Sequence, residues 1–326
     1  MSANRKRLLL PETLHEAGWA IARARPELDL VSYPTEMPDA DFRALLAPAH
    51  GVALGVRPFG QADLAAAPAL EVVGRIGVGY DAVDVPALTR RGIPLMTTGT
   101  ANSVSVAEQA VFFILALAKR WAALDAMVKQ GRWDERFTRL PTEIAGKTAL
   151  VVGFGRIGSR AAARLRGFEM RVLVFDPYVS AAAIRGAGCE AAADLDAALA
   201  QADFATIHCP RNAETTGMFD AVRLGRMKRG AVLVNTARGG IVVEAALHAA
   251  LASGHLSGAG LDVFAEEPTP LENKLLALPN VILAPHVAGV THEAAAAMAR
   301  STVENLLSVL DGAPRRENAV NPEVWG

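Results

Sequence analysis

Three residues in the second half of the chain have side chains that could move a proton beside a bound anion. They are Arg238 in VNTARGG, Glu267 in LDVFAEEP and His286 in LAPHVAG, and each follows an apolar run. A histidine exchanges a proton near neutral pH, a carboxylate can hold it, and a guanidinium binds a carboxylate. This set suits the oxidation of a hydroxyl group beside a carboxylate. A lone histidine among apolar residues is more often a packed core residue, so the rest of the chain has to decide.

A glycine-rich segment lies upstream of these residues. In VVGFGRIGSRAAARL, the glycines Gly153, Gly155 and Gly158 have G-x-G-x-x-G spacing between a β-branched run and an alanine-rich stretch. Such glycines allow a tight turn and close approach of the backbone to a pyrophosphate at a helix N-terminus. Asp176 ends the next apolar run, where a carboxylate can accept hydrogen bonds from ribose hydroxyls and would repel a 2′-phosphate. The pattern predicts a dinucleotide site that favours NAD over NADP.

The composition is that of a globular protein with a small-molecule partner. The 326 residues are 51% apolar and 21% charged, with a formal net charge of −1. This balance predicts binding to neither nucleic acid nor a membrane. Cys189 and Cys209 are the two cysteines, and so few thiols favour a reducing compartment and a cytoplasmic location. The remaining histidines lack the spacing of metal ligands, so no metal site is expected.

Alternating strand and helix patterns predict an α/β fold with parallel sheets. From Thr148 onward, alanine-rich helical stretches separate the β-rich runs TALVV, RVLVF, FATIH, AVLVN, GAGLDV and VILAP. Several of these runs lack polar alternation, which is expected when helices cover both faces of a sheet. The first hundred residues repeat the theme more weakly, with RLLL, GVALGV, LEVVGRIG and IPLMTT as strand candidates. Both parts are therefore expected to be doubly wound parallel sheets.

Two long helical patterns mark the organisation of the chain. Residues 103–131 form one unbroken pattern, and residues 291–312 form another that we expect to return to the first part. The predicted domains are residues 1–101 with 290–326, which would bind substrate, and residues 102–289, which would bind NAD. A cleft between the two domains would hold both ligands.

Several motifs occur in the order that one known family shows. The segments GRIGVGYDAVD, NSVSVAEQ, GFGRIG, FDPY, HCPRNAETTG, NTARGGIVVEAAL, GAGLDVFAEEP and APHVAG resemble the D-isomer-specific 2-hydroxyacid dehydrogenases over residues 50–312. The resemblance implies two Rossmann-like or flavodoxin-like domains. It also implies hydride transfer between NAD and a small-molecule 2-hydroxy or 2-oxo acid of the D series. Because no regulatory domain is expected after residue 312, the chain corresponds to a short form.

The same resemblance implies roles for individual residues. Arg238 binds the substrate carboxylate and carbonyl oxygen, Glu267 pairs with the histidine, and His286 is the acid/base. Glu266 is expected to face solvent, and exchange of the roles of the two glutamates is the alternative that the sequence leaves open. The implied cofactor contacts are Gly153, Gly155, Arg156, Ile157, Gly158, Asp176, Pro210, Thr215, Thr236, Ala237, Asp262 and Gly289. The implied substrate contacts are Arg57, Arg75, Ile76, Gly77, Val78, Gly79 and Asn102. A plain turn is the alternative for Asp262 and for the anion-binding loop around Gly77–Gly79.

Arg57 and Arg75 suggest a second anionic group on the substrate. Both lie in the predicted first domain, and the phosphoglycerate dehydrogenases that the chain resembles carry arginine at both positions. Arg238 and the loop amides already serve one carboxylate, so two further cations imply a phosphate or sulfonate, as in 3-phosphoglycerate or sulfolactate. The alternative is an ordinary surface arginine paired with a nearby acidic residue.

Other functions remain open from the sequence. A general glyoxylate or hydroxypyruvate reductase is the alternative within enzymes, and an NAD-sensing scaffold is the alternative outside them. The intact proton-transfer set argues against the scaffold, but the sequence names neither the physiological substrate nor the preferred direction. By analogy with the family we expect a homodimer. Its apolar contacts would come from Phe112, Phe113, Leu117, Trp121 and Met127, for which core packing is the alternative.

Overall fold

A computed structural model describes residues 5–326, so the first four residues of the predicted first domain lie outside it. The chain divides into two compact units. The first unit is Met1–Asn102 with Val290–Gly326, and the second is Ser103–Gly289. The first boundary lies one residue beyond the predicted one, and the second coincides with it. Within residues 5–326 no helix is long and apolar enough to cross a lipid bilayer.

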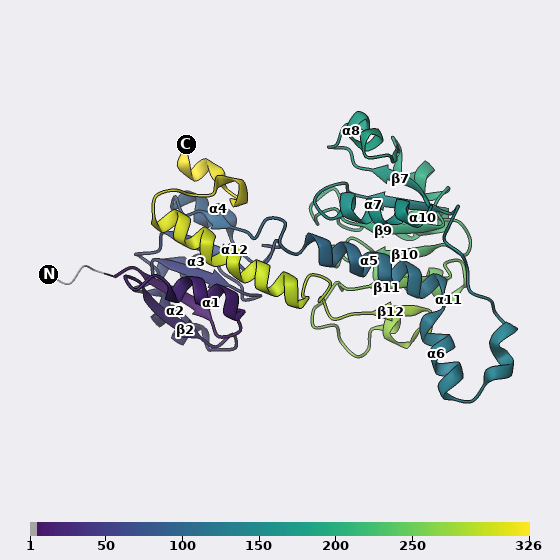
Figure 1. Ribbon diagram of the computed structural model, residues 1–326, viewed down its shortest axis with the longest axis horizontal. Helices are drawn as coiled ribbons and strands as arrows, with labels where there is room; N and C mark the ends of the chain where they lie inside the picture. Colours follow the sequence, from purple (N-terminus) through teal and green to yellow (C-terminus); the bar gives the residue numbers. More distant parts are fainter. Residues whose placement is uncertain (1–4) are drawn as a thin grey trace. The chain divides into compact units, whose positions relative to one another are not determined.

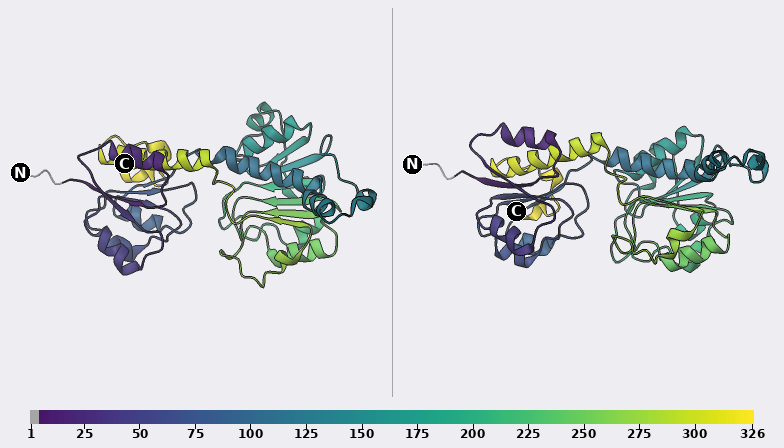
Figure 2. Two further views of the ribbon diagram at one scale, coloured as in Figure 1. Left: turned by 60° about the horizontal axis from the view of Figure 1, so that its bottom comes forward. Right: turned by 90° about the horizontal axis from the view of Figure 1, so that it is seen from below.

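The first unit is a parallel sheet with helices on both faces (Figures 1 and 2). The strand order is β2-β1-β3-β4-β5, with β1 Arg7–Pro11, β2 Asp29–Tyr33, β3 Gly51–Leu54, β4 Val72–Arg75 and β5 Leu95–Met96. Helices α2 (Asp39–Leu46), α3 (Gln61–Ala65) and α4 (Val85–Arg90) share one core with the sheet, and α1 (Glu16–Arg23) and α12 (His292–Leu310) share the other. Leu9 packs in the first of these cores, whereas Leu8 and Leu10 pack in the second. Alternate side chains of a strand face opposite sides, so the unbroken run RLLL fits a sheet covered on both faces.

The end of the chain is part of the first unit, as the sequence predicts. After α12, Ala319 forms an antiparallel bridge with Met96 of β5. The buried Asn321 side chain accepts a hydrogen bond from the backbone N–H of Leu95 at 2.8 Å and donates to the carbonyl oxygen of Ile93 at 3.0 Å. The short 3₁₀ helices η3 (Arg316–Asn318) and η4 (Pro322–Trp325) follow α12. The C-terminal segment thus pairs with the edge strand β5.

The second unit is a larger parallel sheet, which is also wound on both faces. Its strand order is β12-β11-β10-β9-β6-β7-β8, with β6 Thr148–Val152, β7 Arg171–Phe175, β8 Glu190–Ala191, β9 Phe204–Ile207, β10 Val232–Asn235, β11 Gly258–Leu261 and β12 Val281–Leu283. Helices α5 (Ser103–Ala118), α7 (Gly158–Gly167) and α8 (Ala181–Gly186) pack on one face. Helices α9 (Leu195–Leu199), α10 (Ala221–Arg226) and α11 (Glu244–Ala252) pack on the other, with the 3₁₀ helix η2 (Lys274–Ala277). The predicted α/β fold with doubly wound parallel sheets is confirmed, and β2 and β8 are strands that the sequence patterns did not predict.

Helix α5 lies close against the sheet because β11 contains glycines beneath it. A Cβ atom on Gly260 would lie 2.7 Å from Cβ of Phe113, and one on Gly258 would lie 2.9 Å from a methyl carbon of Leu117. Phe113 is 1% exposed as a result, and Met127 is 7% exposed. Both residues are buried within the unit, so the prediction that they supply apolar contacts to a second copy is wrong.

The prediction of one unbroken helix over residues 103–131 is also wrong. Helix α5 ends at Ala118, and α6 (Trp121–Lys129) begins after Arg120, which has a left-handed φ of 51°. The end of α5 is held by the segment that returns from α6, because the backbone N–H of Thr142 donates to the carbonyl oxygen of Ala118 at 2.8 Å. The Arg120 guanidinium also donates to the carbonyl oxygen of Arg139. The break therefore depends on contacts between segments that are about twenty residues apart.

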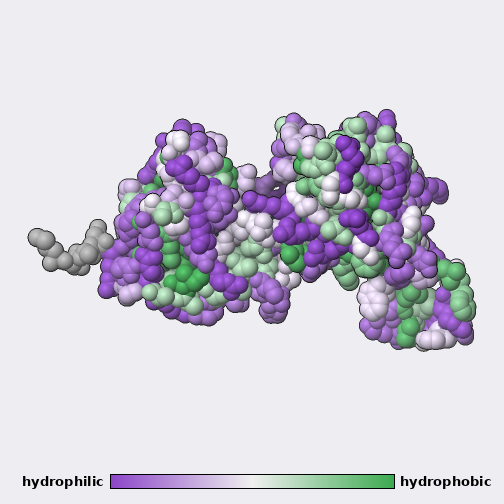
Figure 3. Space-filling view, turned by 45° about the horizontal axis from the view of Figure 1, so that its top comes forward, coloured by the Kyte–Doolittle hydropathy of each residue, from purple (hydrophilic) through white to green (hydrophobic). Residues whose placement is uncertain are grey.

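Residues 119–142 form an arm that extends from the second unit and contains α6 and the 3₁₀ helix η1 (Trp133–Phe137) (Figure 1). Large apolar side chains gather on it (Figure 3). The exposed fractions are 59% for Trp121, 60% for Trp133, 72% for Phe137 and 65% for Leu140. Such a concentration of exposed apolar side chains is typical of an interaction surface.

Candidate active site

The turn between β6 and α7 has the shape that the glycine motif predicts. Gly153 has a φ of 93°, and a Cβ atom there would lie 2.7 Å from the backbone nitrogen of Cys209. A Cβ atom on Gly158 would lie 1.9 Å from the carbonyl oxygen of Gly153, so only glycine allows α7 to begin this close to the strand. At Gly155 the Cβ position is open space. The turn is therefore tight on its inner side and accessible on its outer side.

Backbone donors at this turn are available to an anion. Within residues 5–326, the backbone N–H groups of Gly155, Arg156 and Ile157 donate to no protein acceptor. They directly precede the first residue of α7, which spans ten residues. Unpaired N–H groups at a helix N-terminus attract negative charge, so these groups fit the pyrophosphate of a dinucleotide.

Asp176 stands beside the same turn, at the end of β7. The backbone N–H groups of Phe154 and Tyr178 donate to its two carboxylate oxygens at 2.7 and 2.9 Å. These bonds fix the carboxylate next to the glycine turn, because β6 and β7 are paired strands. An ionised carboxylate has about four acceptor sites, so Asp176 can still accept hydrogen bonds from ribose hydroxyls. The residues present fit the adenosine half of NAD.

The candidate proton-transfer residues follow three strands that are neighbours in the sheet, β10, β11 and β12. His286 Nδ1 lies 2.6 Å from Glu267 Oε2, and the backbone N–H of Phe264 donates to Glu267 Oε1 at 2.9 Å. The histidine and glutamate side chains are 48% and 35% exposed, so the imidazole is accessible to a small molecule. Glu266 is exposed, as expected of the neighbour that does not contact the histidine. The geometry joins a base to a carboxylate that holds it.

Asp262 holds the backbone around the histidine. It is 1% exposed, and its two carboxylate oxygens accept the backbone N–H groups of Val287 and Ala288, each at 2.9 Å. The backbone N–H of His286 donates to the Asp262 carbonyl oxygen at 2.8 Å, and His286 itself has a left-handed φ of 55°. Burial raises the pKa of Asp262, and the two N–H donors oppose that rise. The turn-forming role that the sequence left open is therefore present, and contact of Asp262 with a nicotinamide stays a prediction.

A buried asparagine that the sequence analysis did not select shapes the turn that carries Arg238. Asn235, the last residue of β10, is 2% exposed. Its Nδ2 donates to the carbonyl oxygen of Arg238 at 2.9 Å, and its Oδ1 accepts the backbone N–H of Ala237 at 3.0 Å. The Arg238 guanidinium donates to the Ala237 carbonyl oxygen at 2.6 Å. A polar residue at the end of an apolar run was the only signal for Asn235 in the sequence.

The remaining predicted cofactor contacts lie on loops or strand ends of the second unit. Thr215 Oγ1 donates to the Pro210 carbonyl oxygen at 2.7 Å, which closes the loop after β9. Thr236 is buried, and its hydroxyl has no protein partner among the described residues. Gly289 is the last residue of the unit. Contact of NAD with Pro210, Thr215, Thr236, Ala237 and Gly289 stays a prediction.

His208 also lies at a strand end near the glycine turn but is unsuited to proton exchange. It follows β9, and its Nε2 lies 3.0 Å from Thr206 Oγ1. Burial lowers the pKa of His208 to about 4. The imidazole is therefore neutral near pH 7 and has a structural role beside the strand.

In the first unit, the predicted anion-binding loop has free backbone donors. The N–H groups of Gly77, Val78 and Gly79 donate to no protein acceptor among residues 5–326, while the N–H of Ile76 donates to the carbonyl oxygen of Leu54 at 2.9 Å. The loop follows β4, at the carboxyl edge of its sheet. Consecutive free N–H groups can cradle an anion. Asn102 is buried, 9% exposed, and in the part of the chain that the structure describes its Oδ1 has no protein partner.

The two arginines proposed for a second anion differ in their surroundings. The Arg57 guanidinium pairs with Asp39, donates to the Met37 carbonyl oxygen at 2.8 Å and lies 4.4 Å from the centre of the Phe42 ring. Its side chain is only 11% exposed, so Arg57 has the ion pair that the sequence analysis gave as the alternative. Arg75 lies beside the loop, where its Nη1 donates to the Ile76 carbonyl oxygen at 2.6 Å. Arg57 would have to leave Asp39 to pair with a ligand, whereas the bonds of Arg75 go from Nη1 to the carbonyl oxygens of Leu54 and Ile76.

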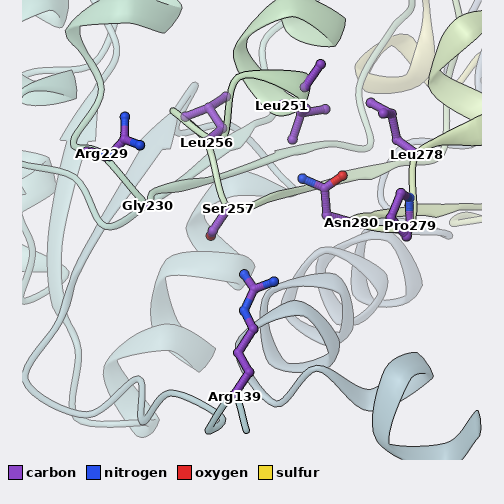
Figure 4. A pocket seen from close by; sticks show the side chains of 11 residues that line it. Arg139, Arg229, Gly230, Leu251, Leu256, Ser257, Leu278, Pro279 and Asn280 are labelled. Atoms are coloured by element: carbon purple, nitrogen blue, oxygen red, sulfur yellow. The ribbon is translucent and has the colours of Figure 1, made fainter. Parts of the chain in front are cut away.

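A separate hollow of about 500 Å³ lies in the second unit at the amino-terminal ends of the strands (Figure 4). It is lined by the residues before β10, β11 and β12, among them Gly230, Ser257 and Asn280, and by Arg139 of the arm. In parallel α/β sheets ligands bind at the carboxyl ends of the strands. This hollow is at their amino ends, so it is separate from the candidate active site.

Comparison with known proteins agrees with this geometry. The model of the D-isomer specific 2-hydroxyacid dehydrogenase NAD binding domain matches residues 111–288. A D-3-phosphoglycerate dehydrogenase from Archaeoglobus fulgidus is 41% identical over 78% of this chain and 48% of its own length. A glyoxylate reductase from Korarchaeum cryptofilum is 40% identical over 79% of this chain and 78% of its own length. The crystal structure of the TT0316 protein from Thermus thermophilus has a TM-score of 0.87 and 33% identity, and covers 96% of this chain and 99% of its own.

The extent of these matches differs. The chain spans about half the length of the phosphoglycerate dehydrogenases that it matches. The family model, in contrast, covers most of the second unit, including the glycine turn, Asp176 and the His286–Glu267 pair. The chain therefore belongs to the D-isomer specific 2-hydroxyacid dehydrogenase family, and its second unit is the NAD-binding domain of that family.

Proposed function

We propose that this protein is an NAD-dependent oxidoreductase that transfers a hydride between nicotinamide and a D-2-hydroxy acid or the corresponding 2-oxo acid. The 2.6 Å contact between His286 Nδ1 and Glu267 Oε2 carries the proposal. It lies at the same edge of the second sheet as the glycine turn that fits a dinucleotide. A scaffold that only bound NAD would have no need of an accessible histidine held by a carboxylate.

Glu267 sets the tautomer of the histidine. Its Oε1 is committed to the backbone N–H of Phe264, so Oε2 is directed at the imidazole and accepts Nδ1–H. The lone pair of His286 then lies on Nε2, where it can accept a proton from a substrate hydroxyl. In the oxidation, Nε2 takes this proton while the C–H bond at C2 breaks and its electron pair leaves as hydride, which gives a carbonyl. Bound NAD would supply the hydride acceptor, and reduction is the reverse.

Anionic recognition is assigned to two groups. Arg238 supplies a fixed cation at the end of β10, which would bind the substrate carboxylate and polarise the carbonyl oxygen as it forms. The free N–H groups of Gly77, Val78 and Gly79 supply uncharged donors to a carboxylate. Both are proposals from the donors present and from the family to which the chain belongs.

Two substrate classes are compatible with these groups. A substrate with a second anion, such as 3-phosphoglycerate, is supported by the dehydrogenase relatives of that name and by Arg75 beside the loop. A general glyoxylate or hydroxypyruvate reductase is the second candidate. The ion pair of Arg57 with Asp39 favours it, because this pair removes one of the two cations that a dianion would need. The relative named glyoxylate reductase also favours it.

We also propose that the protein is a homodimer that associates through the arm. Trp121, Trp133, Phe137 and Leu140 are all more than half exposed, and a second copy would remove them from water. Of the residues predicted from the sequence, Phe112 and Trp121 are exposed at 49% and 59% and can contribute.

We propose a cytoplasmic location for the protein. The cysteines Cys189 and Cys209 are both unbridged, which supports a cytoplasmic location.

The proton-transfer role predicts the behaviour of a histidine variant. His286→Asn removes the atom that exchanges the proton, so kcat should fall about 1,000-fold with any 2-oxo acid that the wild type reduces. The dissociation constant for NADH, followed by its fluorescence, should change by no more than about twofold, because the glycine turn is untouched. His248→Asn on α11 is the matched control. Full turnover in His286→Asn would contradict proton transfer by His286, on which the proposed function rests.

The tautomer argument distinguishes the two adjacent glutamates. In Glu267→Gln, the amide oxygen is needed by the N–H of Phe264, so the amide NH₂ group faces Nδ1 and places the imidazole proton on Nε2. That proton blocks uptake of another, and kcat should fall about 100-fold or more. Glu266→Gln should retain wild-type kcat, because Glu266 is exposed and lacks the contact with His286. Equal losses in the two variants would contradict the assigned pairing.

The second anion can be tested by comparing substrates. If the substrate is a dianion, Arg57→Ala with Arg75→Ala should raise KM for 3-phosphoglycerate about 100-fold through lost charged hydrogen bonds. KM for glyoxylate should change little. Arg43→Ala, which removes another partner of Asp39, controls for damage to that ion pair. A similar rise for both substrates would show that the two arginines hold the unit together and that glyoxylate-type acids are the better substrate class.

The arm predicts the mass of the protein in solution. Light scattering at micromolar concentration should give the mass of two chains. Trp133→Glu with Phe137→Glu should give the mass of one, because two charges from each chain would then have to be buried in the contact. Leu271→Glu is the control, since Leu271 is 90% exposed and lies outside the arm. A wild-type protein with the mass of a single chain would refute the dimer.

A further inference from the structure

One side-chain hydrogen bond joins the two loops on either side of the glycine turn. The hydroxyl of Tyr178, just after β7, donates to Glu214 Oε2 in the loop after β9 at 2.5 Å. Strand β6, which leads into the glycine turn, lies between β7 and β9 in the sheet. The Tyr178–Glu214 bond therefore connects loops on opposite sides of the place where the adenosine half of the dinucleotide fits.

Each end of this bond is held by its own loop. The backbone N–H of Tyr178 donates to Asp176 Oδ1 at 2.9 Å. The backbone N–H of Glu214 donates to Asn212 Oδ1 at 2.9 Å, and Thr215 Oγ1 donates to Pro210 at 2.7 Å. Local turns of this kind restrict the backbone, so Glu214 is presented from a defined position.

The bond also brings two carboxylates to one tyrosine. Hydrogen bonding to Glu214 is the main cause of a raised pKa of Tyr178, and the negative charges of Glu214 and Asp176 add to it. Within residues 5–326, neither Asp176 nor Glu214 forms an ion pair with a lysine, arginine or histidine. The adenosine side of the glycine turn thus carries two carboxylates that form no ion pair within the described part of the chain.

We propose that Glu214, positioned by Tyr178, is a second specificity determinant of the nucleotide site and acts with Asp176 to exclude a 2′-phosphate. This inference rests on the proposed NAD-dependent function. A phosphate monoester carries a charge of about −1.5 to −2 near pH 7, so each nearby carboxylate repels it. Tyr178 is 77% exposed and Glu214 is also exposed, so water weakens the repulsion, and one such carboxylate is expected to change a dissociation constant by about tenfold at most. NAD lacks this phosphate and is not penalised.

The test uses NADH and NADPH, which differ only in the 2′-phosphate, and measures their dissociation constants by fluorescence. Glu214→Gln keeps an oxygen that can accept from Tyr178 but removes the charge. It should tighten NADPH by up to about tenfold and change NADH by no more than about twofold. Tyr178→Phe keeps both charges but frees Glu214 to turn toward solvent, so it should tighten NADPH by a smaller factor. Glu143→Gln, at an exposed acid before β6, should change neither constant.

Salt gives a second readout. The gain in NADPH affinity of Glu214→Gln over wild type should shrink in high salt, because exposed charges are screened. An unchanged NADPH-to-NADH ratio in Glu214→Gln would overturn the inference, and so would a wild type that binds neither nucleotide. Normal nucleotide binding with no turnover on any 2-oxo acid would contradict only the proposed function and leave the role of Glu214 in place.

Discussion

The position of His286, the proposed proton-transfer residue, depends on one buried carboxylate. Asp262 accepts the N–H groups of Val287 and Ala288 with its side chain and that of His286 with its carbonyl oxygen. These three bonds link the end of β11 to the turn after β12 and hold His286 in a left-handed backbone conformation that few non-glycine residues adopt. Strained backbone of this kind persists where the surroundings fix it, and it is common at functional sites. With the backbone fixed in this way, His286 Nδ1 lies 2.6 Å from Glu267 Oε2.

The order of the strands explains why one sheet can carry both the proposed nucleotide site and the proposed proton-transfer pair. In the second unit β6 lies inside the sheet, β7 and β8 follow on one side of it, and β9 to β12 follow on the other. The glycine turn and Asp176 follow the inner strands, whereas Arg238, Glu267 and His286 follow β10 to β12. Because all strands are parallel, every one of these loops emerges at the same edge. The proposed proton-transfer residues and the proposed cofactor contacts thus lie at the carboxyl ends of the same sheet but follow different strands.

Local patterns predicted most of what depends on neighbours in the sequence. The glycine motif, the apolar strands and the order of helix and strand could all be inferred, because each depends on the types of residues a few positions apart. The break at Arg120 could not, since it depends on contacts with Arg139 and Thr142. Strand β2 was missed because Asp29 and Ser32 interrupt its apolar residues, and its pairing with β1 stabilises it.

Side-chain partners across loops were the least predictable part of the site. Arg57 has Asp39 as its partner, and Tyr178 has Glu214, because the fold brings separate loops together. The pairing of Glu267 with His286 was inferred only through the resemblance to a family, not from spacing. Asn235, which shapes the turn of Arg238, gave no signal beyond its place at the end of an apolar run.

The contact between α5 and β11 has a consequence for how this sequence can vary over time. The space that a side chain at position 260 would occupy is filled by Phe113, which approaches the strand at a distance that only glycine allows. The volume of this layer is therefore shared between two positions almost 150 residues apart in the chain. A larger residue at 260 becomes acceptable only in a lineage that has already reduced the residue at 113, and the order of the two changes matters. These positions are expected to evolve as a pair, and the history of one restricts the future of the other.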